Sequence, residues 1–269
     1  MNKDLLLTAE QLADAIAESL PEFWFAYADC NPSAVRLSFE GAEGVSFGLP
    51  HPLFNQIVRT DSSLDSARVV AIRDQMNKRG LPWFWIGPPS TQTGDLQAIL
   101  TAAGLVESSS LPGMALDLLS TSLDTSVPHD LQIHEVRDRA GLDAFADGVL
   151  SAYQMPSSFR AYFVKAHETH GYYPNFPVRM FYGVCEGRSV TGSLVFFGKQ
   201  VAAIQCVGTI PQVRGRGFAS AVVCACLQAA REEGYRYAVL HASEMGYPIY
   251  CRLGFATYFK QSFLMPRSA

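Results

Sequence analysis

Charged residues are scarce in this 269-residue chain, and positive charge is not concentrated anywhere in it. Lys, Arg, Asp and Glu make up 17% of the residues, the formal net charge is -4, and there is no run of Lys or Arg. Nucleic acids and anionic membranes attract positive surfaces, so neither is expected as a partner. No run of 18 apolar residues exists, and the apolar run within the opening MNKDLLLTAEQ is too short for a signal peptide. A small neutral or basic substrate fits this composition better.

The chain also lacks the cysteine and histidine spacing of a metal site or a disulfide framework. Its six cysteines are scattered and mostly embedded in apolar stretches: Cys30, Cys185, Cys206, Cys224, Cys226 and Cys251. The pair Cys224 and Cys226 would point about 200° apart on a helix, and no carboxylate or cysteine completes a set with His167 and His170. The sequence therefore predicts a cytoplasmic protein with reduced cysteines and no metal.

Apolar residues make up 48% of the chain, which is enough for a well-packed core and leaves little room for disorder. The length suits one large domain or two ordinary ones. The stretch STSLDTSVP (120–128) is rich in Ser and Thr and ends in proline, which is typical of a linker. We therefore expect two domains, residues 1–125 and 126–269.

The first domain shows alternating helical and strand patterns. Thr8 and Gln11 indicate a capping box that opens a helix over residues 8–20, and Gly80 and Gly104 are positioned to end two further helices. The apolar patterns predict the following elements: strands at 23–28, 34–39, 44–49, 81–87 and 113–119, and helices at 64–80 and 94–104. The first half is therefore expected to be mixed α and β.

The second domain begins a new pattern of the same class. It predicts strands at 131–136, 178–186, 189–198, 201–209, 237–242 and 255–265, and helices around 139–153, 157–170, 218–233 and 247–254. Between the strand that ends near Thr209 and the helix that begins near Phe218 lies the segment GTIPQVRGRGFAS (208–220). A glycine-rich turn between a strand and a helix holds anionic oxygens, because the first helical N–H groups lack partners and glycine permits close approach.

Two separated motifs resemble those of the GNAT acetyltransferases. Gln212-Val-Arg-Gly215-Arg-Gly217 is similar to the pyrophosphate loop Q/R-x-x-G-x-G/A of that family, and Tyr250-Cys-Arg-Leu-Gly254-Phe255 is similar to its Tyr-x-x-Leu-Gly-Phe element. The resemblance covers about residues 130–269. It implies an α/β fold with a mixed sheet, in which acetyl-CoA lies between two central strands that separate after a bulge in the fourth strand.

The resemblance also implies where acetyl-CoA binds. The edge formed by Cys206, Val207 and Thr209 is expected to bond the pantetheine amides, and a backbone N–H near Val207 to polarise the thioester carbonyl. The remaining cofactor-binding residues implied are Gln212, Val213, Arg214, Gly215, Arg216, Gly217, Phe218 and Ala219. Main-chain groups of Val213–Phe218 would hold the pyrophosphate. Arg214 and Arg216 either add charge to the CoA phosphates or are solvated loop residues.

Acetyl transfer to an amine requires a proton donor for the departing thiolate and a neutral amine. Tyr250 matches the family's tyrosine acid. Many relatives carry a glutamate base in the fourth strand, but this chain has Gln205 there. Glu244 is therefore the candidate base, with His241 as the other group to consider, although a water chain would make a dedicated base unnecessary.

An aromatic wall for the acceptor is implied by the resemblance, because the helical insertion between the first two strands of the family borders that pocket. The aromatic residues in or beside it are Tyr153, Tyr172, Tyr173 and Phe176. They would receive an aliphatic or cationic amine, unless they simply form core and surface packing.

The first half repeats the coarse order of elements without either motif, although Leu100-Thr-Ala-Ala-Gly104-Leu105 is a faint echo of the second. We therefore expect a tandem GNAT-like acyl-CoA N-acyltransferase fold with a degenerate N-terminal half. The expected activity is acetyl-CoA-dependent N-acetylation of a small-molecule amine by a monomer or homodimer. The alternatives are a silent CoA-binding sensor and an N-acetyltransferase of proteins or peptides.

Overall fold

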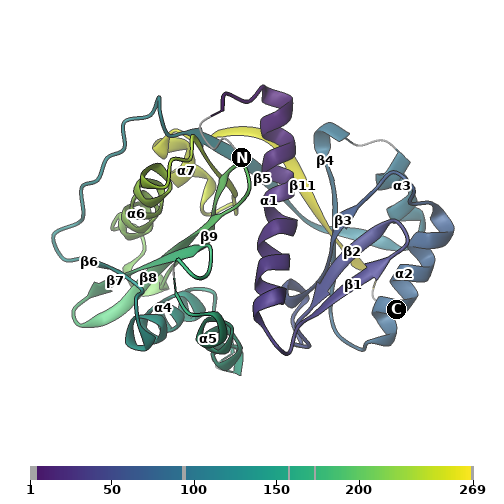
Figure 1. Cartoon of the computed structure of the whole chain (residues 1–269), viewed down its shortest axis with the longest axis horizontal. Helices are drawn as coiled ribbons and strands as arrows, with labels where there is room; N and C mark the ends of the chain where they lie inside the picture. Colours follow the sequence, from purple (N-terminus) through teal and green to yellow (C-terminus); the bar gives the residue numbers. More distant parts are fainter. Residues whose placement is uncertain (1–4, 93–94, 157, 173, 268–269) are drawn as a thin grey trace.

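The computed structural model describes residues 5–92, 95–156, 158–172 and 174–267 and folds them around one mixed sheet of eleven strands. The strand order is β1-β2-β3-β4-β11-β5-β10-β9-β8-β7-β6. Figure 1 shows two lobes, with β1 to β4 in one and β6 to β9 in the other, and helix α1 between them. The fold class expected from the sequence, an α/β mixed sheet in a tandem arrangement, is confirmed.

The N-terminal half contains three helices and five strands among its described residues. In chain order they are α1 (Ala9–Cys30), β1 (Val35–Phe39), β2 (Ala42–Ser46), β3 (Asn55–Thr60), α2 (Ser66–Lys78), β4 (Phe84–Pro89), α3 (Asp95–Ala102) and β5 (Leu105–Asp117). Short 3₁₀ turns occupy Pro52–Phe54 and Ser90–Gln92. The predicted order of helix, strands, helix, strand, helix, strand is confirmed.

Helix α1 is longer than the sequence pattern indicated. The capping box forms as expected, since Thr8 Oγ1 accepts from the Gln11 N–H and Gln11 Oε1 accepts from the Thr8 N–H. The helix then continues through Pro21 to Cys30, so the predicted strand over residues 23–28 is wrong. The run FWFAYA is uniformly apolar because α1 lies between the two lobes and is buried there on several faces. Such a run has no period that separates a buried helix from a buried strand.

Two further differences between the predicted and observed elements of this half concern strands: β3 was not predicted, and β5 is longer than predicted. Strand β3 was not predicted, because NQIVRT carries polar residues that the fold buries: Asn55 and Gln56 are 1% and 0% exposed. The Asn55 amide donates to the carbonyls of Leu49, His51 and Pro82, which satisfies it inside the protein. Strand β5 begins eight residues before the predicted start at Gly113.

The C-terminal half follows the predicted order closely. Its elements are β6 (Gln132–Glu135), α4 (Arg139–Ala152), α5 (Ser158–His170), β7 (Val178–Cys185), β8 (Arg188–Phe197), β9 (Ala202–Thr209), α6 (Phe218–Glu232), β10 (Tyr237–His241), α7 (Tyr247–Leu253) and β11 (Ala256–Pro266). A 3₁₀ turn at Pro211–Val213 separates β9 from α6. Within the residues that the structure describes, no helix is both long and apolar enough to cross a bilayer.

The last strands of the two halves are exchanged. Strand β11, from the C-terminal half, pairs with β4 and β5, while β5, from the N-terminal half, pairs with β10. In Figure 1 these two long strands run side by side from one lobe to the other. Each half therefore completes the sheet of the other, and the 1–125 and 126–269 ranges, which stay a prediction, share one continuous sheet.

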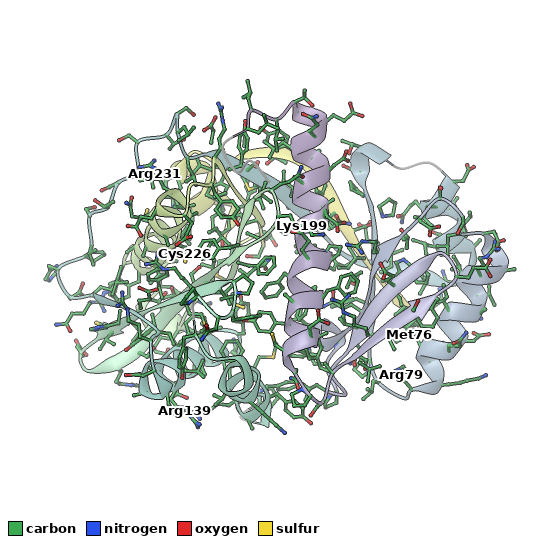
Figure 2. All side chains as sticks on the ribbon, viewed as in Figure 1. Met76, Arg79, Arg139, Lys199, Cys226 and Arg231 are labelled. Carbon is green, nitrogen blue, oxygen red and sulfur yellow. The ribbon has the colours of Figure 1, made fainter. Side chains whose placement is uncertain are left out.

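The helices cover the sheet on two faces. One hydrophobic cluster joins α1, α4 and α5 to residues from both halves, including Val45, Val58, Leu194 and Val239. On the opposite face, α6 and α7 pack over the C-terminal strands and α2 and α3 over the N-terminal ones. Helix α1 also holds the turn between β8 and β9, where the Lys199 N–H donates to Glu22 Oε2 at 3.0 Å; Lys199 is labelled beside α1 in Figure 2.

Candidate functional site

The site begins where the two central strands of the C-terminal half separate. Strands β9 and β10 are parallel and are paired only at Ala202 with Ala238 and at Ala203 with Val239. From Ile204 onward β9 has no partner strand on that side, whereas its other edge stays paired with β8 as far as Thr209. The separation exposes main-chain groups at the carboxyl ends of the strands, which is where open α/β sheets place their ligands.

A β-bulge in β9 lies at the start of this opening. Gly192 is opposite Gly208 and Leu194 is opposite Gln205, so Cys206 and Val207 together face the single residue Ser193. Cys206 adopts a left-handed conformation with φ of 55°, which is costly for a residue with a side chain. A bulge re-aims the strand and leaves residues without ladder partners. The bulge implied by the family resemblance is therefore present in this strand.

The turn that follows β9 depends on two glycines. Gly215 and Gly217 have φ of 79° and 82°, and a Cβ added at Gly215 would meet no atom within 4 Å. These residues are exposed, and Gly217 is the N-cap of α6 without any side-chain capping bond. Glycine adopts this conformation without a steric cost and keeps the space in front of the helix open. Their role as cofactor-binding positions stays a prediction.

The same turn presents a row of unused hydrogen-bond donors. Within the described chain, no backbone or side-chain acceptor is paired with the N–H groups of residues 215–220. The Val213 and Arg214 N–H groups, by contrast, donate to Ile210 and Pro211 in the 3₁₀ turn. Unpaired N–H groups together with the partial positive charge of a helix N-terminus form an anion-binding site. The donors centre on residues 215–220, slightly after the predicted Val213–Phe218.

The two arginines of this turn are engaged with the protein. Arg214 donates from Nε to the Thr209 carbonyl at 3.0 Å and from Nη2 to the Ala152 carbonyl at 3.3 Å, so it fixes the turn against β9 and α4. Arg216 forms an ion pair with Asp130 and lies over the Phe218 ring, 4.8 Å from its centroid. Gln212 is exposed and Ala219 is half-buried in the first turn of α6. Both guanidiniums remain at the rim of the donor row, where they add positive potential.

Tyr250 lies on α7, is 6% exposed and packs in the cluster beneath α6. Its ring contacts Phe255 at 5.8 Å, which holds it against the α6 and α7 side of the sheet. Burial, followed by the charge of Cys226 on α6, raises the pKa of Tyr250 to about 12. None of the described residues forms a hydrogen bond with its hydroxyl group. A phenol in this state keeps its proton at neutral pH and has it available for donation.

Unlike Tyr250, the predicted base Glu244 is exposed to solvent. It is exposed in the loop between β10 and α7, next to the equally exposed Ser243 and Met245. That loop begins directly after β10 ends, at the mouth of the opening. Glu244 can therefore reach the opening only from the solvent side, so a proton would travel to it through water.

Two other polar side chains lie deeper in the opening. Gln205 and His241 follow Ala203 and Val239 by two residues on β9 and β10, so alternation places them on the face covered by α1, α4 and α5. The Gln205 Nε2 atom and both His241 ring nitrogens are buried and have no partner among the described residues. Burial lowers the pKa of His241 to about 4, so the ring is neutral at pH 7. Buried polar atoms without partners are rare and indicate a missing ligand or water.

The aromatic residues expected around the acceptor differ in their burial and contacts. Tyr153, at the end of α4, donates from its hydroxyl to the Val207 carbonyl at 3.0 Å, so it touches the bulge directly. Phe176 is 4% exposed and packs edge-to-face on Tyr27 of α1, 5.3 Å away, which makes it part of the core. Tyr172 is half-buried after α5. Tyr173 and the side chains of His167 and His170 lie outside the described residues.

The reduced state of the cysteines agrees with the structure, in which all six are free thiols. Cys206 and Cys226 lie on the two elements that border the opening, and burial raises the pKa of each thiol to about 12. A thiol with that pKa is not a nucleophile at neutral pH. Within the described ranges, no group of three His, Cys, Asp or Glu side chains has the arrangement of a metal site.

Comparison with known proteins finds one family model and several solved structures that this chain resembles. Residues 188–258, from β8 into β11, match the profile described as acetyltransferase (GNAT) domain. A GCN5-related N-acetyltransferase from Kribbella flavida has a TM-score of 0.70 at 15% identity, covering 94% of this chain and 96% of that one. One from Sphaerobacter thermophilus scores 0.65 at 15% identity, covering 85% and 82%. No curated protein gave a significant sequence match.

A solved tandem structure shares the fold over the whole chain. A tandem GNAT protein from the clavulanic acid biosynthesis pathway has a TM-score of 0.61 at 12% identity, and 98% of each chain is covered. At these identities the likeness defines the fold over the whole length, while the sequence profile covers the segment that carries the bulge, the glycine turn and Tyr250. The GNAT resemblance inferred from two motifs is confirmed.

Proposed function

We propose that this chain, whose residues 188–258 form a GNAT acetyltransferase domain within a tandem GNAT fold, is an acetyl-CoA-dependent N-acetyltransferase of small-molecule amines. The observation that carries the proposal is the unpaired N–H row of residues 215–220, which follows the bulged strand β9 and the 3₁₀ turn after it. Fold alone does not define function. These residues supply the chemistry that the reaction requires.

The donor row fits a pyrophosphate. Its N–H groups are consecutive, exposed and at a helix N-terminus, and a Cβ is absent at the two positions where it would obstruct approach. The free edge of β9 beyond Ala203 fits the extended pantetheine chain, whose amides can bond to main-chain groups as an added strand does. When bound, acetyl-CoA supplies the acetyl thioester.

Two side chains, Tyr250 and Glu244, are proposed to carry out the two proton transfers of the reaction. The Tyr250 hydroxyl, kept protonated by burial, is proposed to protonate the departing thiolate. Glu244 is proposed to receive the amine proton through water, since its carboxylate lies on the exposed loop at the mouth of the opening. Gln205 cannot accept a proton in the position where many relatives carry a glutamate, so this longer route replaces a direct one.

The acceptor is proposed to enter on the face covered by α1, α4 and α5. There Gln205 offers an N–H donor and neutral His241 offers one donor and one acceptor, all without protein partners. A polar substrate group would satisfy them, and an uncharged pair is compatible with an amine that must be neutral to react. Tyr153 and Tyr172 border the same face, so an aliphatic or aromatic amine body would have an apolar surface to pack on.

The binding step is tested by two matched glycine variants. Gly215 and Gly234 lie at opposite ends of α6, both with φ of 79° and both with open space where a Cβ would be. Gly215→Ala and Gly234→Ala should therefore lose similar stability, about 1 kcal/mol. Calorimetry should show CoA affinity reduced at least about 30-fold in Gly215→Ala only. Equal affinities in the two variants would contradict the proposed pyrophosphate site.

The chemical step is tested by two matched tyrosine variants. Thiol release from acetyl-CoA, measured with a panel of amines and peptides, should fall about 100- to 1,000-fold in kcat for Tyr250→Phe, with CoA affinity unchanged. Tyr247→Phe changes an exposed hydroxyl on the same helix and should leave kcat within about twofold. CoA binding without release for any acceptor would favour the sensor alternative, and release with peptides alone would favour the protein substrate.

A further inference from the structure

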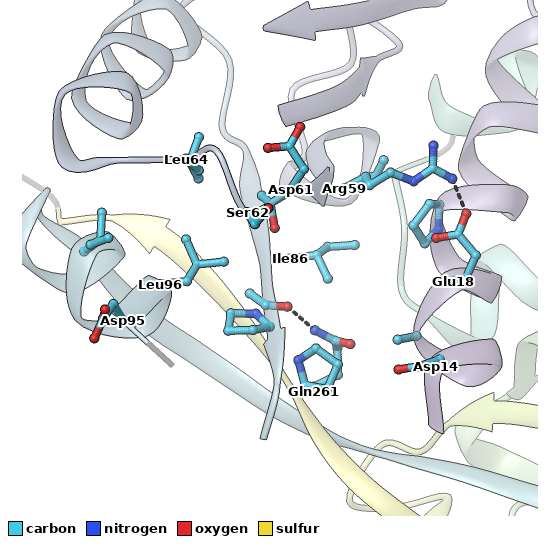
Figure 3. A pocket seen from close by; sticks show the side chains of 18 residues that line it. Asp14, Glu18, Arg59, Asp61, Ser62, Leu64, Ile86, Asp95, Leu96 and Gln261 are labelled. Atoms are coloured by element: carbon cyan, nitrogen blue, oxygen red, sulfur yellow. Dashed lines mark hydrogen bonds and ion pairs between the residues drawn. The ribbon is translucent and has the colours of Figure 1, made fainter. Parts of the chain in front are cut away.

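A cavity lies in the N-terminal half, away from the acetyltransferase site. It has a volume of about 670 Å³ and is bordered by α1, α3, the ends of β3 and β4, and β11 (Figure 3). It forms where the parallel strands β3 and β4 separate, since they are paired only at Gln56 with Phe84 and at Ile57 with Trp85. This is the arrangement of β9 and β10 repeated in the other half.

The chemistry of this second opening is opposite to that of the first. The N-terminus of α2, which follows β3, is closed by its own side chains, because Asp65 Oδ1 accepts the Arg68 N–H at 2.9 Å. Just before it, Asp61 Oδ1 accepts the Ser63 N–H at 2.8 Å. Carboxylates therefore occupy the donors that would otherwise hold phosphates. A CoA-like anion is excluded here by charge and by the lack of available N–H groups.

The walls of the cavity are rich in acceptors. Four carboxylates line it, and its single guanidinium, Arg59, is already bonded to Glu18 and Glu43. Pro88 and Pro89 on the β4 side have no N–H to offer. The lining carboxylates are Asp14, Glu18, Asp61 and Asp95. A ligand that matches these walls must donate hydrogen bonds and carry positive charge.

A buried amide at the back of the cavity points to the same kind of ligand. Gln261, on β11, is 1% exposed, and its Nε2 donates to the Gly87 carbonyl (Figure 3). No donor among the described residues reaches its Oε1, although the residue lines the cavity. This oxygen is not among the fully buried atoms that lack a partner, so it reaches the cavity and can accept a hydrogen bond there. A ligand N–H at this position would satisfy it.

The spacing of the carboxylates favours an extended ligand over a single ion. They come from α1, the segment after β3, and α3, and within the described ranges no three such side chains converge as a metal site requires. Between them the surface is aliphatic, from Ala17, Val58, Ile86, Leu96 and Ile99. Separated carboxylates joined by aliphatic surface match several ammonium groups joined by methylene chains. The volume lies in the usual range of small-molecule sites.

We propose that the opening between β3 and β4 is a binding site for an aliphatic polyamine, with ammonium groups at the carboxylates, one N–H at Gln261 Oε1 and methylenes on the aliphatic walls. The N-terminal half thus retains the separated strands of its fold for a cation in place of an anion. This site does not depend on acetyl transfer and is distinct from the acceptor site beside Gln205 and His241.

The test is calorimetric titration of the full chain with spermidine, with no acetyl-CoA present. Asp61→Asn combined with Asp95→Asn should weaken spermidine binding at least about tenfold, since two exposed carboxylates at the rim lose their charge while keeping their shape. The matched control is Asp124→Asn with Asp147→Asn, because Asp124 accepts the Ser126 N–H as Asp61 accepts that of Ser63, and Asp147 is an exposed helical carboxylate. The control should bind spermidine like the original chain.

Three results would overturn the proposal. They are the absence of saturable heat with spermidine, equal loss in the two double variants, or equal heat from magnesium chloride or from a diol of the same length. Binding of CoA, measured separately, should be unchanged in Asp61→Asn/Asp95→Asn. If CoA binding fails in the original chain while spermidine binding follows the expected pattern, the acetyltransferase proposal falls and the polyamine site stands.

Discussion

The two openings of the sheet occupy equivalent places in the two halves and differ in charge and in available hydrogen-bonding groups. In each, two parallel strands are paired at only two positions and a helix connects them, α6 between β9 and β10 and α2 between β3 and β4. Ahead of α6, six N–H groups are unpaired; ahead of α2, Asp61 and Asp65 accept the N–H groups. The backbone architecture provides the opening, and a few residues decide which ligands it accepts.

The helices after the openings differ in the same way. Tyr250 on α7 and Leu100 on α3 stand at matching positions of the two related segments, four residues before Gly254 and Gly104. Both glycines are left-handed, with φ of 97° and 82°, so the turn after the helix is preserved. Leu100 is fully buried and has no proton to donate. The N-terminal half thus keeps the shape of the fold without a counterpart of Tyr250 or of the unpaired N–H groups before α6.

The largest expected effect comes from converting one helix N-terminus into the other. Gly217→Asp would place a negative charge at the N-cap of α6, in a left-handed position (φ 82°) where Asp65 of α2 is extended (φ -118°), and this charge would repel the phosphates. We expect CoA affinity to fall about 1,000-fold, or about 4 kcal/mol, by calorimetry.

Gly217→Asn is the matched control for this prediction, because it has nearly the same shape and also tolerates a left-handed conformation. It should weaken CoA binding less, since it lacks the charge. Equal affinities for the two variants would show that charge at this helix end does not decide the ligand.

A smaller effect should appear in the pH dependence of stability. The folded-state pKa of His241 is depressed to about 4 from 6.5, so its contribution to stability is present above pH 6.5 and is lost as the pH falls toward 4. The loss is expected to reach about 3 kcal/mol at the lower end. Urea unfolding at pH 7, 5.5 and 4.5 would measure it.

In His241→Gln this part of the pH dependence should disappear. His134→Gln changes an exposed histidine on β6 and should leave it in place. An unchanged slope in His241→Gln would mean that the ring has the same pKa in the folded and unfolded protein, so that burial does not keep it neutral below pH 6.5.

The smallest effect concerns the capped helix. Asp65→Ala removes the bond to the Arg68 N–H and the ion pair with the Arg68 guanidinium, so the free energy of unfolding should fall by about 1 kcal/mol. CoA affinity should stay unchanged, because α2 is not the anion site. Added CoA binding at a second site in this variant would show that the carboxylate alone had kept the N-terminal opening from anions.

Local patterns in the sequence predicted most elements of the fold. The capping residues Thr8 and Gln11, the helix ends at Gly80, Gly104 and Gly254, and the order of strands in the second half all depend on short-range geometry. The errors fall where burial from distant residues overrides local pattern. The FWFAYA run is helical because both lobes surround α1, and NQIVRT is a strand because Asn55 finds three carbonyl acceptors in the fold.

The residues of the candidate site can also be separated into those that local sequence patterns indicate and those that only tertiary packing brings together. Two motifs pointed to the glycine turn and to Tyr250, because each motif is a set of residue types at a fixed spacing; their roles stay predictions. That the Gln205 Nε2 atom and the His241 ring nitrogens are buried without a partner among the described residues follows only from tertiary packing. The same holds for the hydrogen bond from Tyr153 to the Val207 carbonyl. Alternation along β9 and β10 was the one signal that paired Gln205 with His241.

The sequence by itself determined that residues 208–220 present bare backbone donors before a helix, because glycine and the absence of a capping side chain act over a few neighbouring residues. Only the tertiary structure decided that β5 and β11 change places between the halves, and that a cavity lined by carboxylates from three separate segments opens between β3 and β4. Those features join residues more than a hundred positions apart, and no local pattern records such contacts.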